Sequence, residues 1–143
     1  MSLGLIAKST VTIQAPVAKV WEALISPELI KKYMFGTEVI SDWHVGSAII
    51  WKGEWKGKPY EDRGTIYKME KNEKLEVSHF SPLEGLPDEP ENYHTLIYEL
   101  SPEGEEATVL TLSQDNNPDE KAKEHSKQMW DKMLAEIKKL LEE

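Results

Sequence analysis

The chain of 143 residues has no cysteine, 39% hydrophobic and 30% charged residues, and a formal net charge of −9. These values suit one globular domain, residues 1–143, with an apolar core of its own, and they exclude disulfides, thiolate catalysis and cysteine-based zinc sites. Because no Lys or Arg occurs between Lys74 and Lys121, where twelve acids lie, the chain lacks the basic stripe that nucleic acids and anionic membranes require.

The N-terminal part begins with a predicted strand over residues 6–14, where β-branched residues alternate loosely with other types. Pro16 then introduces a short helix, whose apolar residues keep helical spacing: Val17, Val20, Trp21 and Leu24. A second short helix, with Ser26 as its N-terminal cap, should end between residues 33 and 36. Two helices of this length do not form a core by themselves, and we expect them to cover part of a larger structure.

Six further strands are predicted, and their expected ranges are 37–41, 47–55, 60–70, 75–80, 93–100 and 107–114. Short turns join neighbouring strands, among them one at Gly57-Lys58-Pro59, so the sheet should be antiparallel. The connection Ser81–Asn92 is long for a hairpin and contains three prolines. We interpret it either as the rim or lid of a pocket or as a solubilising acidic loop.

The C-terminal segment has the strongest helical pattern in the chain. From Pro118 onwards the face expected to be buried repeats for about six turns: Ala122, Ser126, Met129, Trp130, Met133, Leu134, Ile137, Leu140 and Leu141. Such a helix is roughly 35 Å long, enough to cross the whole sheet. We expect Asp115 and Asn116 to turn the chain and cap this helix. The predicted class is therefore α+β, with a curved antiparallel sheet of seven strands around a long C-terminal helix.

Three segments together resemble a known superfamily: Ala15–Leu24, the run Pro90–Thr95, and Gln114–Asn117 leading into Glu124–Ser126 with Trp130. Their order resembles the START-like or SRPBCC superfamily, whose fold is called helix-grip. The chain is most similar to bacterial single-domain proteins related to the C-terminal domain of the activator of the heat-shock protein 90 ATPase. The resemblance implies a sheet that grips the last helix, in many members with an apolar cavity between them. It also implies a chaperone as an alternative partner, although the two-domain co-chaperones carry a further N-terminal domain.

Six residues are predicted to line such a cavity and to bind a small hydrophobic or amphipathic ligand: Trp51, Trp55, His79, Tyr98, Trp130 and Met133. The first four share strand faces with one another or with apolar neighbours, and the last two lie on the apolar helix face. Core packing explains each aromatic residue equally well, and a hydrogen-bonded role explains His79. Met129 and Met133 are adaptable side chains that suit a pocket of loose specificity.

No catalytic residue, metal site or cofactor is predicted. The four histidines lack the paired spacing of metal ligands, and no Gly-x-Ser-x-Gly motif or glycine-rich phosphate loop occurs. The carboxylates Glu54, Glu61 and Asp62 could serve acid–base chemistry, but beside a hairpin turn they are more typical of a solvated surface. An enzyme of unknown reaction is therefore the third and weakest hypothesis. Since neither a membrane span nor a secretory signal is visible, we expect a cytoplasmic protein.

Overall fold

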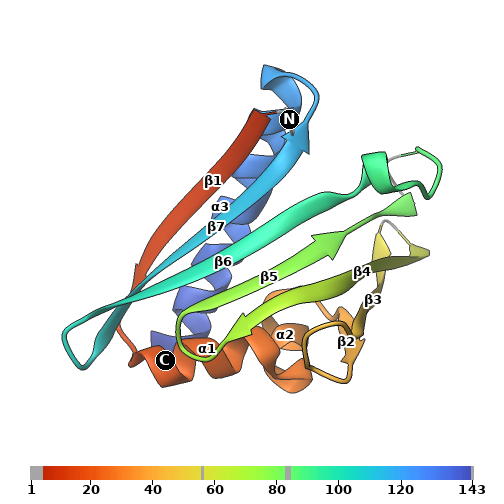
Figure 1. Ribbon diagram of the computed structural model, residues 1–143. Helices are drawn as coiled ribbons and strands as arrows, with labels where there is room; N and C mark the ends of the chain where they lie inside the picture. The colour runs from red at the N-terminus through yellow and green to blue at the C-terminus, as the bar shows by residue number, and fades with distance from the viewer. Residues whose placement is uncertain (1–4, 56, 83–84, 143) are drawn as a thin grey trace.

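A computed structural model describes residues 5–55, 57–82 and 85–142 of the chain. Within these ranges seven strands form one antiparallel sheet, which curves around a long helix (Figure 1). The strands are β1 (Leu5–Ile13), β2 (Glu38–Ser41), β3 (Ala48–Trp55), β4 (Lys58–Glu70), β5 (Lys74–His79), β6 (His94–Glu103) and β7 (Ala107–Asn117). The helices are α1 (Val17–Ile25), α2 (Pro27–Tyr33), the 3-10 helix η2 (Pro90–Asn92) and α3 (Glu120–Glu142). The predicted α+β class and the predicted order of elements are confirmed.

The strands lie in the order β1-β7-β6-β5-β4-β3-β2, so the first strand of the chain pairs with the last. The hydroxyls of Thr10 and Thr111 lie 3.3 Å apart across this pair, although 101 positions separate them in sequence. All other neighbours in the sheet are also neighbours in the chain. Figure 1 shows α3 crossing one face of the sheet, with α1 and α2 at the end of the sheet near the C-terminus.

Strand β4 approaches β5 very closely at Gly64. Residues 58–65 pair with β3, and residues from Ile66 onwards pair with β5. Arg63 pairs with β3 and also with Phe80, directly after β5. A Cβ added to Gly64 would lie 1.8 Å from the carbonyl oxygen of Ser78, so only glycine permits this close approach of two backbones. The Ser78 hydroxyl also accepts a hydrogen bond of 2.9 Å from the backbone N–H of Thr65. This close approach places the first half of β4 against the end of β5, where Arg63 and Phe80 exchange two backbone hydrogen bonds.

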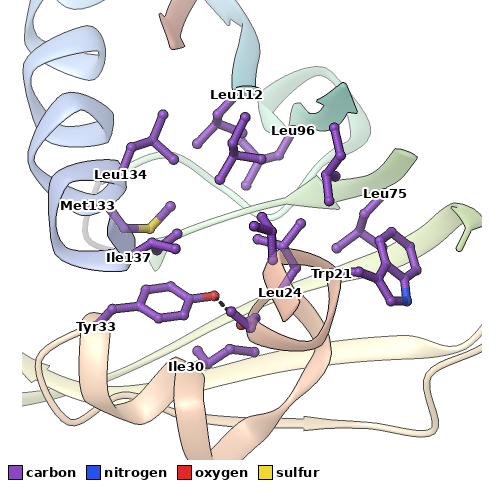
Figure 2. Close-up of a cluster of buried hydrophobic side chains, with 14 of the residues drawn as sticks. Trp21, Leu24, Ile30, Tyr33, Leu75, Leu96, Leu112, Met133, Leu134 and Ile137 are labelled. Atoms are coloured by element: carbon purple, nitrogen blue, oxygen red, sulfur yellow. Dashed lines mark hydrogen bonds between the residues drawn. The ribbon is translucent and has the colours of Figure 1, made fainter. Parts of the chain in front are cut away.

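The core fills the concave side of the sheet. Helix α3 contributes four buried side chains to it, Trp130, Met133, Leu134 and Ile137. Figure 2 shows three of them facing apolar residues of α1, α2 and the central strands. The predicted burial of Trp130 is confirmed, whereas the assignment of Met129 to the apolar face is wrong. Met129 lies about 100° around the helix from Trp130, and its side chain is 49% exposed.

The junction between β7 and α3 differs from the prediction. Strand β7 continues to Asn117, and α3 begins only at Glu120. The cap of α3 is Asp119, whose carboxylate accepts a hydrogen bond of 2.8 Å from the backbone N–H of Ala122. Asp115 instead accepts a bond of 2.6 Å from the N–H of Thr95. The prediction that Asp115 and Asn116 cap the last helix is therefore wrong, because both residues still belong to the strand.

Two predictions about local turns have different outcomes. The Ser26 hydroxyl accepts a bond of 3.4 Å from the N–H of Leu29, so its predicted role as the cap of α2 is confirmed. The turn expected at Gly57-Lys58-Pro59 is shorter, because Lys58 and Pro59 already belong to β4 and pair with β3.

Polar contacts fasten one flank of α3 to β1. The Ser9 hydroxyl donates a short hydrogen bond to Asp131, and Lys127 donates to the same carboxylate at 2.8 Å. Nearer the C-terminus, the ammonium of Lys138 lies 2.8 Å from the carbonyl oxygen of Thr12. These helix residues follow one another at intervals of four and seven, which places them on one flank beside the β1 edge of the sheet.

Candidate functional site

Four of the six predicted pocket residues lie in or against one apolar cluster between the sheet and α3. Trp51, Trp130 and Met133 are 7%, 8% and 5% exposed and belong to it, and the half-buried Tyr98 packs against it. His79 is connected to the cluster through Trp51, since their rings meet edge to face with centroids 4.9 Å apart. The side chain of Trp55 lies outside the part of the chain that the structure describes. That these residues line a ligand cavity stays a prediction.

Trp130 is held by a polar network at the start of α3. Its indole N–H donates to the side-chain oxygen of Gln114 at 2.5 Å. The Gln114 amide nitrogen lies 3.4 Å from the hydroxyl of Ser126, which donates to Asn117 at 2.9 Å. Asn117 is 1% exposed and donates to the backbone oxygen of Leu5 at 2.9 Å. Every polar side chain of this network has a partner, so its role is to join β7, β1 and α3.

A second polar group, which the sequence did not predict as a unit, lies beside Trp51. In the strand register Trp51 of β3 lies opposite Asp62 of β4, so the side chains of Trp51 and Asp62 both occupy the concave face. The Asp62 carboxylate lies 2.9 Å from Nε2 of His79, and these side chains are only 13% and 18% exposed. The expectation that Asp62 is solvated is therefore wrong, whereas Glu54 and Glu61 are exposed as expected.

This Asp62–His79 pair has unused hydrogen-bonding capacity. Oδ1 of Asp62 is buried and has no partner among the described residues, and Nδ1 of His79 takes part in no hydrogen bond with them. The other orphaned buried oxygen in the described part of the chain belongs to Asn72, in the turn between β4 and β5. Leaving a buried acceptor unsatisfied typically costs about 1–3 kcal/mol, and more for a charged group.

Two tyrosines contribute to the cluster, the buried Tyr33 as a member and the half-buried Tyr98 packed against it. The Tyr33 hydroxyl donates to the backbone oxygen of Ala23 at 2.9 Å (Figure 2). Burial raises the pKa of Tyr33 well above its usual value, and the nearby Tyr98 raises it further. Burial likewise raises the pKa of Tyr98. Both phenols therefore stay protonated at ordinary pH and offer no phenolate for catalysis.

The predicted pocket residues line neither of two surface depressions formed by described residues. One, of about 540 Å³, lies beside α1 and is lined by Ala18, Trp21, Glu22, Ile25, Met69 and Lys71. The other, of about 400 Å³, is lined mainly by charged and polar residues of β1, β6, β7 and the turn between β4 and β5. In the described ranges no three His, Asp or Glu side chains gather as metal ligands would, and no helix is long and apolar enough to cross a membrane.

The sequence model of one family, described as Activator of Hsp90 ATPase homolog 1-like protein, matches residues 14–142. The chain belongs to this family. It is 53% identical to a protein from Cytophaga hutchinsonii, whose solution structure matches with a TM-score of 0.86 over 99% of this chain and 97% of the other. Among curated proteins no sequence matches the chain.

More distant structures share the fold of this family. The Aha1 dimer from Colwellia psychrerythraea has a TM-score of 0.74 at 19% identity over 96% of each chain. An HSP90 activator from Plasmodium falciparum has a TM-score of 0.76 at 19% identity, also over 96% of each chain. At such low identity the likeness shows the fold alone. Together with the family match it confirms the resemblance to the helix-grip superfamily.

Proposed function

We propose that this family member binds a small amphipathic molecule at the concave face of its sheet, with the polar head at Asp62 and His79 and the apolar body against Trp51. The observation that carries the proposal is the unpartnered, buried Oδ1 of Asp62. A bound molecule that donates a hydrogen bond to this atom would remove the cost of its burial.

The contrast with the network around Gln114 supports this interpretation. Both groups contain buried polar side chains beside a tryptophan, and both lie on the concave face of the sheet. The Gln114 network satisfies its members internally, as a purely structural group should. The Asp62–His79 pair leaves acceptors unused, which is typical of a site that another molecule completes.

We expect a neutral amphiphile such as dodecanol to bind with a stoichiometry near one to one, detected by native mass spectrometry and calorimetry. Trp51→Ala should weaken binding about tenfold, which corresponds to about 1.4 kcal/mol, because it removes the apolar wall beside the polar pair. Trp21→Phe is the matched control, since Trp21 lines the depression beside α1 instead. Absence of binding, or equal loss in both variants, would contradict the proposed site.

A second candidate function is association with a chaperone, in line with the description of the family and of the Plasmodium falciparum structure. The twelve acids between Lys74 and Lys121, a stretch without Lys or Arg, supply negative charge that suits a basic partner. Binding to purified heat-shock protein 90 that weakens steeply with salt would favour this function.

A further inference from the structure

We infer that the molecule bound at Asp62 and His79 is a cationic amphiphile, whose primary ammonium group donates hydrogen bonds to the pair. The inference rests on the proposed function and names the class of ligand for the same site. It follows from three features of the described residues: the acceptors of the pair, the scarcity of cations around it, and the adjoining aromatic ring.

The pair presents acceptors to a ligand. When Nε2–H of a neutral His79 donates to Oδ2 of Asp62, Nδ1 keeps a free lone pair, and Oδ1 of Asp62 is a second acceptor. An ammonium group has three donors and can satisfy both atoms at once, whereas a hydroxyl has a single donor. A carboxylate or phosphate head would bring further lone pairs and negative charge to a site that already contains both.

Strands β5, β6 and β7 offer almost no cationic side chain to an anionic head. After Lys74, strands β5, β6 and β7 carry no Lys or Arg. Arg63, the single arginine of the chain, is paired with Asp88 at 3.0 Å. A fatty acid would therefore place its carboxylate beside Asp62 without a lysine or arginine from these strands to compensate the charge.

The aromatic neighbour favours a cation as well. The ring of Trp51 packs edge to face on His79, so a group bound to the pair lies close to an indole. Indole faces attract cations more strongly than other aromatic side chains do, and the attraction increases when water is excluded. Trp51 is 7% exposed, which provides that exclusion.

The test compares dodecylamine, dodecanol and dodecanoate, which share one alkyl chain and differ in head group, below their micelle concentrations. We expect calorimetry on the wild-type chain to show dodecylamine binding at least about tenfold tighter than dodecanoate. Asp62→Asn should reduce this preference to about twofold, because a neutral amide loses the attraction for the cation. Glu61→Gln is the matched control, since it removes the same charge from the adjacent, exposed position and should keep the preference.

The outcomes separate the two proposals. If all three amphiphiles bind equally well, or dodecanoate binds tightest, the ligand class is wrong while the binding function stands. If none binds, the orphaned oxygen is satisfied by an ordinary water molecule and both proposals fail. The wild-type series alone decides between these results, even if Asp62→Asn does not fold.

Discussion

Trp130 contributes both an apolar ring and one buried hydrogen bond to the interface between α3 and β7. Helical spacing is enough to predict that this residue is buried, and the structure confirms it. Its partner Gln114 was not predictable in the same way. That contact depends on how α3 is placed against β7, and this placement follows from the junction between them, whose ends a sequence pattern does not locate reliably.

Substitution of Trp130 separates these two contributions. Trp130→Ala should lower the free energy of unfolding by about 3–5 kcal/mol, as truncation of a large core aromatic does. Trp130→Phe keeps most of the ring but leaves the Gln114 oxygen buried without a donor, which should cost about 1–3 kcal/mol. Urea unfolding measures both. A loss below about 1 kcal/mol for the alanine variant would show that the ring is not part of the core.

The residues of the candidate site were only partly predictable from the sequence. Strand parity predicts that Trp51, His79 and Tyr98 share the concave face, and it does so from alternating neighbours. Asp62 was missed because a carboxylate close to a hairpin turn is usually solvated. Its parity is that of the buried Ile66, and the register shift in β4 lies only after Ile66. The pairing of Asp62 with His79 depends on how β4 and β5 lie side by side, which alternation along one strand does not describe.

Among the elements, α3 depends on its polar contacts with β1 as well as on its apolar face. The apolar face was predictable from periodicity. The polar contacts were not predictable from periodicity, because they depend on which strand lies beside the helix. Strand β1 lies there because it pairs with β7. Hydrogen bonds from Lys127 and then from Ser9 lower the pKa of Asp131.

These contacts predict a specific dependence of stability on pH. A carboxyl whose folded-state pKa is depressed stabilises the fold above its unfolded pKa, about 3.9 for Asp, and this contribution is lost as the pH falls through the folded pKa. We therefore expect the free energy of unfolding to fall more steeply below about pH 4 for the wild type than for Asp131→Asn. Ser9→Ala, which removes one donor, should give an intermediate slope in urea titrations at several pH values. Parallel curves for the three proteins would show that the contacts do not stabilise α3.

At the scale of the whole molecule, the sequence predicts the class, the number of strands and the long terminal helix, and the structure confirms all three. The sequence does not predict whether side chains fill the space between the sheet and α3. The filling of this space depends on the fit of side chains from seven strands and three helices, which periodicity does not describe. The two depressions lie elsewhere on the molecule, and the core residues pack together under α3.

Met133→Trp tests whether that space is filled. In a packed interior the larger side chain should lower the free energy of unfolding by about 1–3 kcal/mol through overpacking. Met129→Trp is the matched control on the same helix, where 49% exposure leaves room for the ring. It should change stability by less than about 0.5 kcal/mol. Unchanged stability of Met133→Trp in urea unfolding would instead reveal a void beside the helix, large enough to receive the alkyl part of a ligand.

Pairing of the first strand with the last has a consequence for biosynthesis. While the chain grows on a ribosome, β1 has no strand beside it until β7 has been made, 101 positions later at the level of Thr10 and Thr111. At about 5–20 residues per second this delay lasts about 5–20 s. During that time the inner face of β1, which includes Ala7 and Ile13, stays exposed to solvent and to other nascent chains. Contacts between such distant segments also form slowly. Completion of the sheet therefore waits for the synthesis of β7, and until then the unpaired edge of β1 is open to aggregation.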